Sequence, residues 1–150
     1  MWFRDPMTTL FEASGGAPAF LALATAFHAR CLDDPELNHP FSHPDGNPEH
    51  VQRLAAYWGQ VLGGPPVFST ECGSQSSMVQ MHCGNGDMTD LGRRFVSCFE
   101  GALGDAGLPA DVRPALVEYI RWAVDDVLSY EDSAPDALAM PHWSWDGLTA

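Results

Sequence analysis

The sequence predicts an all-α fold. Apolar residues recur at spacings of three and four along most of the chain, which is the period of an amphipathic helix. No long stretch alternates apolar with polar residues as a half-buried strand does, and no internal repeat is present. With 150 residues, of which 45% are hydrophobic, the chain is long enough for one domain with a core. We therefore expect a single domain over residues 1–150.

The expected helices begin and end at residues that suit helix caps. Thr9 and Glu12 form a capping box, and a Gly pair ends the short helix that follows. Asn47 and Pro48 suit the start of a later helix, and Asp111 suits the N-cap of the last one. Apolar stripes place the longer helices at about 18–33, 48–62, 88–103 and 111–128, with a short helical segment at 78–82.

Three segments do not follow a helical pattern. Residues 37–48 contain three prolines, which forbid a long helix, and Phe41 is the one large apolar group there and is expected to plug the core. Residues 65–77 are rich in Pro, Ser and Gly and are expected to form a loop. From residue 131 the chain is acidic, yet Trp143 and Trp145 favour burial, so we expect this tail to dock on the helices.

Charge and composition exclude several classes of function. The formal net charge is −13, because 20 acidic residues outnumber seven cations, all of them arginines. Binding to nucleic acid or to an anionic membrane needs cations that neutralise phosphates, so we expect neither partner. There is no run of about 18 apolar residues and no signal sequence, which favours a soluble cytoplasmic protein. Four irregularly spaced cysteines form no C-x-x-C pair and are expected to be reduced thiols.

Three histidines lie on or beside apolar helical faces. Met78 and His82 are four residues apart, on one face of a short helix that a glycine turn ends. His50 begins an apolar stripe that Leu54 continues, and His28 lies at the shoulder of a buried face. A single histidine of this kind is more often a core residue that is hydrogen-bonded to a carbonyl. Three that can converge, beside a proline-rich interruption, instead describe a pocket for a flat apolar cofactor.

Several short segments carry a family resemblance. They are Leu10–Gly16, Phe27–Arg30, Leu54–Pro65, Met81–His82 and Arg94–Phe99. In these segments and their spacing the chain resembles the truncated haemoglobins, and within them the group II type. The resemblance implies a truncated two-over-two globin fold with a short N-terminal helix, a haem-binding core at about 8–130 and an extended C-terminal tail at about 131–150. It also implies haem b as the cofactor.

The resemblance implies that His82 is the proximal ligand of the haem iron. A neutral imidazole binds ferrous iron and leaves the opposite face open for a diatomic gas. The other ring N–H needs an acceptor, and a backbone carbonyl of the same segment suits it best. For Trp58, plain core packing is an equal alternative to a place in the haem pocket. The residues expected to line the haem are Phe41, Leu54, Tyr57, Trp58, Met78, Met81, Phe95 and Phe99.

Four positions depart from the usual group II residues. The chain has His28 where group II members usually carry tyrosine, and Phe95 where they carry tryptophan. His50 stands over the distal face, where the residue is often small, and Met81 stands where a basic residue commonly precedes the proximal histidine. The contacts of the haem propionates therefore stay unassigned.

His50 and His28 are the candidate catalytic residues on the distal side. In one arrangement His50 donates its N–H to the bound ligand, with His28 as a second donor or as its orienter. In another, His50 is the sixth ligand of the iron and the gas must displace it. An outward-pointing His28 and a His50 that swings to solvent as a gate also stay open.

The expected function is that of a haem protein that binds dioxygen, carbon monoxide or nitric oxide. A distal side with two histidines favours redox chemistry, such as nitric oxide dioxygenase or peroxidase-like activity. Turnover would need a separate electron-donating reductase, because the chain has no G-x-G-x-x-G dinucleotide site. The alternatives are a gas carrier or sensor, or a bis-histidyl electron-transfer globin, without turnover. A globin-like module that has lost haem is disfavoured by His82, and the oligomeric state, a homodimer included, stays open.

Overall fold

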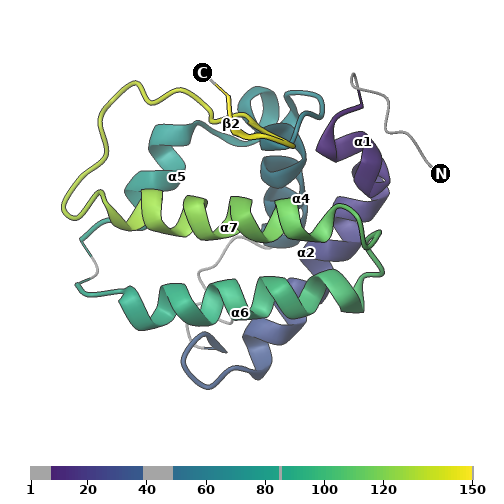
Figure 1. Ribbon diagram of the computed structural model, residues 1–150. Coiled ribbons are helices and arrows are strands. Elements are labelled where there is room, and N and C mark those ends of the chain that lie inside the picture. Colours follow the sequence, from purple (N-terminus) through teal and green to yellow (C-terminus); the bar gives the residue numbers. More distant parts are fainter. Residues whose placement is uncertain (1–7, 39–48, 85, 150) are drawn as a thin grey trace.

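The structure is a computed structural model, and it describes residues 8–38, 49–84 and 86–149. Its elements confirm the all-α prediction for the body of the molecule (Figure 1). The tail adds a two-stranded antiparallel hairpin, in which Trp143 is paired with Leu148. The elements are α1 (Leu10–Ser14), α2 (Gly16–Asp33), α4 (His50–Val61), the π-helix η1 (Phe68–Cys72), α5 (Gln75–Met81), α6 (Thr89–Asp105), α7 (Arg113–Leu128), β1 (Trp143–Ser144) and β2 (Gly147–Leu148).

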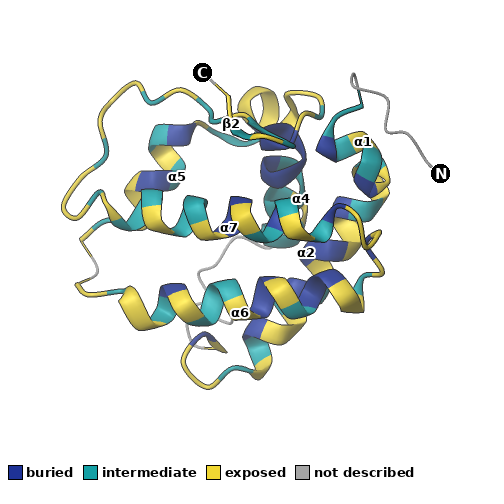
Figure 2. Ribbon diagram, viewed as in Figure 1, coloured by how far each residue is buried: buried dark blue, intermediate teal, exposed yellow. Residues whose placement is uncertain are grey.

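Two pairs of helices make the body of the fold. α2 packs on α4, α6 packs on α7, and α2 also contacts α6 (Figure 1). Between the pairs lies an aromatic core, in which the ring centroids of Phe27 and Trp58 are 5.2 Å apart and those of Trp58 and Phe99 are 5.0 Å apart. Both contacts are edge-on, which is a favoured geometry for aromatic rings. The buried faces of all four helices turn toward this core (Figure 2).

The N-terminal helix has the predicted N-cap, Thr9, but only half of the capping box, because the Glu12 carboxylate accepts from the Thr9 hydroxyl and not from its backbone N–H. The Thr9 hydroxyl oxygen accepts a hydrogen bond from the backbone N–H of Glu12 at 3.1 Å. Gly15 then ends the helix in the left-handed region, at φ 116°, where a residue with a Cβ is strained. The end of α1 is therefore fixed by the sequence in the way that was expected.

The start of α7 differs from the prediction. Asp111 is not the N-cap, because α7 begins at Arg113 and its N-cap is Val112, which makes no side-chain cap hydrogen bond. Pro114 occupies the first turn, where its missing N–H costs no helical hydrogen bond. The expected helix start at Asn47 and Pro48 lies outside the described residues.

The segment predicted as a loop at residues 65–77 contains η1 and the start of α5. The side-chain amide of Gln60 holds η1, since it donates to the Ser69 hydroxyl at 2.8 Å and accepts from the Ser69 N–H at 2.9 Å. Ser74 and Ser77 form a reciprocal capping box that opens α5. Pairs of serines and glutamines are common in loops, so this helical content was not evident from composition.

Phe11 packs α1 closely against the end of α4. Its N–H donates to the Leu62 carbonyl at 2.8 Å, and its ring stacks on Phe20 with centroids 5.6 Å apart. The ring lies so close to Gly59 and Gly64 that an added Cβ would be 3.1 Å and 2.6 Å from its carbon atoms. Glycine is required here because of this close approach.

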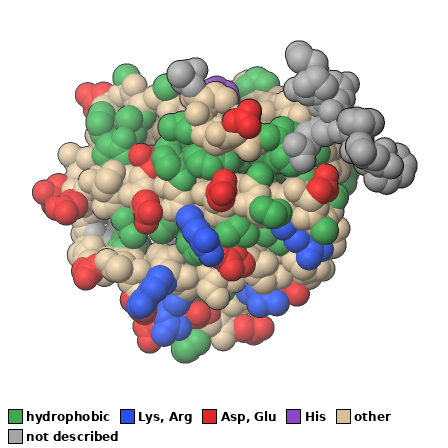
Figure 3. Space-filling model, in the orientation of Figure 1, with side chains coloured by type: hydrophobic (Ala, Val, Ile, Leu, Met, Phe, Trp, Pro, Cys, Tyr) green, Lys and Arg blue, Asp and Glu red, His purple; other side chains and the backbone are tan. Residues whose placement is uncertain are grey.

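The surface charges are unevenly paired. Ion pairs with Asp105, Asp34, Asp90 and Glu100 are made by Arg30, Arg93, Arg94 and Arg121. Most of these pairs are exposed and contribute little stability each. In Figure 3 the basic side chains lie beside acidic ones on the face shown. Within the described residues no helix has the length and apolar character that a membrane span needs. All four cysteines are thiols that form no disulfide, as predicted.

The tail docks on the helices, as its tryptophans predicted. Trp143 packs on Tyr119 and Trp122 of α7, with ring centroids 5.9 Å and 5.4 Å away. The indole N–H of Trp145 donates to the carbonyl of Thr8 at 3.0 Å. The last described residues therefore contact both α7 and the residue that precedes the α1 cap.

Gly64→Ala is expected to lower the free energy of unfolding by about 1–3 kcal/mol, because the added Cβ collides with Phe11. Gly104 is an exposed residue inside α6 with nothing within 4 Å of an added Cβ. Gly104→Ala is therefore the matched control, and it should raise the unfolding free energy by about 0.5–1 kcal/mol through helix propensity. Urea denaturation of the three proteins measures both effects, and equal stabilities of the two variants would contradict this packing.

Candidate functional site

A cavity of about 300 Å³ lies between α4, α5, α6 and α7, and its wall is mostly apolar. Cavities of this kind, with a few polar groups on an apolar wall, are typical of cofactor and ligand sites. The predicted residues that line it are His50, Leu54, Tyr57, Trp58, Met78, Met81, His82 and Phe95. The structure therefore brings together most of the side chains that the sequence assigned to the haem pocket.

Three predicted site residues are not among the described residues that line the cavity. Phe99 does not line the cavity but is fully buried behind it, where its ring packs on Trp58. His28 does not line the cavity either. Phe41 lies outside the described residues. Met81 reaches the wall, but 71% of its surface is exposed, so it lies at the mouth of the cavity.

His82 follows directly on α5 and is its C-cap residue. Its ring atom Nδ1 is 2.8 Å from the carbonyl oxygen of Met78, one helical turn earlier. Because a carbonyl oxygen can only accept, Nδ1 carries the proton and the lone pair of Nε2 is free to bind a metal. This is the arrangement in which a histidine serves as an axial ligand.

His28 and His50 form a pair of which only His50 lines the cavity. Their ring centroids are 5.7 Å apart, and both side chains are half-buried. Burial lowers the pKa of His50 below its ordinary value, and the electrostatic effects of His28, Arg53 and His82 lower it further. His50 is therefore neutral at pH 7, with one N–H to donate and one lone pair.

Arg53 lines the cavity but was not predicted as a site residue from the sequence. It lies on α4 three residues after His50, lines the cavity, and donates to the carbonyl oxygen of Cys72 at 3.0 Å. Among the described wall residues it is the one permanent cation. Its helical spacing from His50 was a signal that could have placed it on the same wall.

The far wall of the cavity comes from α7, which the sequence analysis predicted as a helix without a role in the site. Its cavity-lining face is mostly apolar but includes Asp126, a carboxyl whose pKa is raised by burial. The apolar stripe of this helix was visible in the sequence, although its partner was not. The residues of α7 that line the cavity include Tyr119, Ile120, Trp122, Ala123, Val124, Val127 and Leu128.

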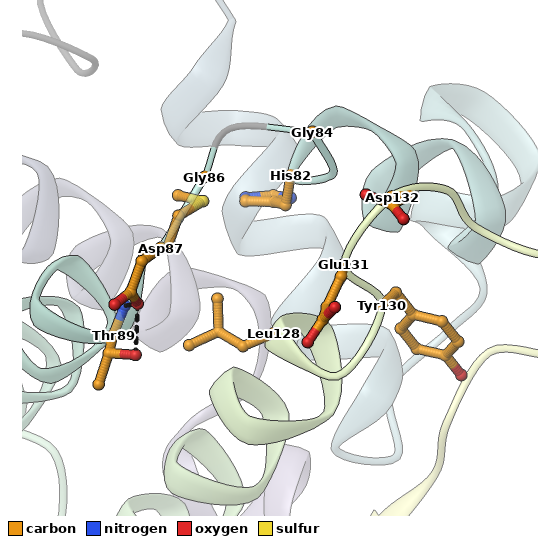
Figure 4. Close-up of a pocket in the computed structure, with 10 residues that line it drawn as sticks. His82, Gly84, Gly86, Asp87, Thr89, Leu128, Tyr130, Glu131 and Asp132 are labelled. Atoms are coloured by element: carbon orange, nitrogen blue, oxygen red, sulfur yellow. Dashed lines mark hydrogen bonds between the residues drawn. The ribbon is translucent and has the colours of Figure 1, made fainter.

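A second hollow of about 500 Å³ adjoins the cavity at His82 (Figure 4). Its wall carries Asp87, Glu131 and Asp132, with no cation among the described lining residues. The Asp87 carboxylate is held in place because it accepts from both the hydroxyl and the N–H of Thr89. The surroundings of His82 are therefore apolar on the cavity side and acidic in this hollow.

All of the residues that line the cavity lie in a part of the chain that other proteins share. The sequence matches the bacterial-like globin family over residues 9–129. No curated protein matches the chain in sequence.

Solved structures give the same result for the fold. A variant of the group II truncated haemoglobin of Bacillus anthracis is 26% identical, with a TM-score of 0.71 over 83% of this chain and 92% of that one. A thermostable haemoglobin of Thermobifida fusca is also 26% identical, with a TM-score of 0.67 over 80% of this chain and 96% of that one. The haemoglobin of Chloroflexus aurantiacus is 24% identical, with a TM-score of 0.69 over 80% and 97% of the two chains.

The low pKa of His50 predicts a loss of stability in acid. The unfolded chain binds a proton at the ordinary histidine pKa of about 6.5, whereas folded His50 binds it only at lower pH. The unfolding free energy of the haem-free protein should therefore fall as the pH drops below about 6.5. Urea denaturation between pH 8 and pH 5 should show a smaller fall for His50→Gln than for His142→Gln, a change at an exposed tail residue. Equal pH dependence in the two variants would contradict the assignment.

Proposed function

Since the chain belongs to the bacterial-like globin family and is thus a haem globin, we propose that His82 holds the iron of haem b and that a diatomic ligand binds on the side of His50. The observation that carries this proposal is the hydrogen bond from His82 Nδ1 to the Met78 carbonyl at 2.8 Å. It fixes the tautomer in which Nε2 can coordinate a metal, on a residue that lines an apolar cavity.

The residues present fit a haem group. The cavity wall is mostly apolar, as a porphyrin face requires, and it includes two imidazoles, that of His50 on α4 and that of His82 after α5. Haem also carries two propionates, which need a cation or water. Arg53 supplies the cation at the wall, whereas the hollow beside His82 is lined by acids that would repel a carboxylate. We therefore assign Arg53 as a propionate partner.

Ferrous haem held by His82 would supply the metal that binds the diatomic ligand. The protein supplies the surroundings of that position. His50 is neutral at pH 7 because of its lowered pKa, so it can donate a hydrogen bond to the ligand without placing a full charge in the cavity. His28, with its ring 5.7 Å from that of His50, is placed to orient it. Such a donor slows the loss of a ligand that carries partial negative charge.

A second arrangement is supported by the same wall. His50 and His82 line one cavity, so His50 could serve as the sixth ligand of the iron. The protein would then be a bis-histidyl globin suited to electron transfer or to gated binding.

In the first arrangement, with His50 as hydrogen-bond donor, the polar distal side supports nitric oxide dioxygenation or peroxide reduction, and a separate reductase would supply the electrons. Dioxygen, carbon monoxide and nitric oxide are the ligands proposed.

The visible spectrum of the haem-loaded protein tests the iron ligand. The wild-type protein should show a Soret band that shifts when carbon monoxide is added to the ferrous form, and His82→Ala should abolish stable haem uptake. His142→Ala, a change at an exposed tail histidine, is the matched control and should leave uptake unchanged. A ferrous high-spin spectrum supports His50 as donor, and a low-spin one supports His50 as ligand. Haem retention by His82→Ala would show that another residue binds the iron.

The role of His50 is tested by the rate of oxygen dissociation. His50→Leu removes the proposed donor, so the rate should rise about tenfold to a hundredfold, as expected for a hydrogen bond of about 1.5–3 kcal/mol. His142→Leu is the control and should leave the rate unchanged. Flash photolysis or stopped-flow exchange with carbon monoxide gives the rate. An unchanged rate in His50→Leu would remove the donor role.

A further inference from the structure

The segment that follows α7 crosses over α5 and is joined to it by hydrogen bonds. We call residues 130–138 the strap. It lies beyond the part of the chain that matches the bacterial-like globin family, which ends at residue 129. In Figure 1 the chain leaves α7, turns around α5 and returns to the hairpin. Figure 4 shows Tyr130, Glu131 and Asp132, the start of the strap, beside the turn that carries His82.

The hydrogen bonds come from one stripe of α5 and the turn after it. Ser76 donates its hydroxyl to the Pro135 carbonyl at 2.7 Å and accepts from the Leu138 N–H at 2.8 Å. Gln80 Oε1 accepts from the Ala134 N–H at 3.0 Å.

The turn after α5 adds two more contacts. The Cys83 thiol lies 3.2 Å from the Tyr130 carbonyl, to which it donates, and the Gly84 N–H donates to the Glu131 carbonyl at 3.0 Å. Ser76, Gln80 and Cys83 are four and three residues apart, so they lie on one helical face. Met78 and His82, which line the cavity, lie on another.

α5 needs such support. It has seven residues, and helices shorter than about 12 residues are marginal on their own. It packs only weakly against the other described helices, and only Gln75 and Val79 of its residues are buried. Its first turn is tied to α4, because the Tyr57 hydroxyl donates to Gln75 Oε1 at 2.7 Å. Its last turn, which carries His82, is tied instead to the strap.

We propose that Ser76 and Gln80 are positioning residues for the iron ligand, and that they act on His82 by holding α5 against the strap. The acceptor that orients the His82 ring is the Met78 carbonyl of the same helix, so a shift of α5 moves the ring and its hydrogen bond together. The inference rests on the proposed function, because it assumes that His82 binds iron.

Ser76→Ala removes both strap hydrogen bonds of the hydroxyl and leaves the Leu138 N–H and the Pro135 carbonyl without this partner. Ser76→Thr keeps a hydroxyl and is the rescue variant. Ser129→Ala is the matched control, since its hydroxyl donates to the Asp126 carbonyl within the end of α7 and does not touch α5. The double variant Ser76→Ala with Gln80→Leu removes the strap contacts of both side chains.

Two measurements on the full-length chain test the proposal. In the haem-free chain, amide exchange at residues 79–83 should be about tenfold faster in Ser76→Ala and faster still in the double variant, with wild-type rates in Ser76→Thr and Ser129→Ala. In the ferrous haem-loaded protein, the iron–histidine stretching band in the resonance Raman spectrum should shift to lower frequency and broaden in the same variants.

The outcomes separate this inference from the proposed function. If no variant changes either measurement while the wild-type protein binds haem, the strap does not position His82 and the inference is wrong. Faster exchange with an unchanged stretching band would mean that the strap stabilises α5 without acting on the ligand, and this too overturns it. If the wild-type chain takes up no haem, the proposed function fails, whereas the exchange rates still report whether the strap holds α5.

Discussion

The site depends on one hydrogen bond, from the ring of His82 to the carbonyl of Met78. It decides which nitrogen carries the proton and which can bind a metal. Both partners belong to α5 or its cap, so the orientation of the ring follows that helix and not the large helices of the core. This explains how a fold whose core lies between α2, α4, α6 and α7 can place its reactive group on a seven-residue helix. α4, α6 and α7 form most of the cavity wall, and α5 positions the His82 imidazole at that wall.

Much of the fold could be predicted from the residues. The stripes of α2, α6 and α7, the Thr9 cap and the break at Gly15 are local features, and local periodicity reports them directly. The wall residues Leu54, Tyr57 and Trp58 were predicted because the family resemblance covers them. His50 and Met78 were predicted from their places on apolar helical faces. Prediction from local sequence failed at η1 and α5. η1 depends on Gln60, which lies outside the segment, and α5 depends on a serine capping box that resembles an ordinary loop sequence. Asp111 suited a cap, yet the helix starts after it, at Arg113.

Contacts between distant parts of the chain were harder to predict from the sequence than the helices were. Arg53 could have been placed from its spacing to His50, but its direction into the cavity depends on how α4 packs. Phe99 was predicted to line the haem, but its ring is buried against Trp58 and does not line the cavity. The strap contacts involve small polar groups, such as Ser76 and the carbonyl of Pro135, and neither has a pattern that names the other. Periodicity predicts which face is buried, but it does not predict what covers it.

The hydrogen bond between Trp145 and Thr8 joins residues 137 positions apart. Closing so long a loop costs chain entropy that only contacts already made elsewhere can offset, and the cost rises as the logarithm of loop length. Contacts of high sequence separation also slow folding, so the helices, whose contacts are more local, are expected to form before the tail is seated. The tail is then the last region to dock and the first to open in native-state fluctuations. Local opening of the C-terminal region would loosen α5, the helix that carries His82, long before the aromatic core unfolds.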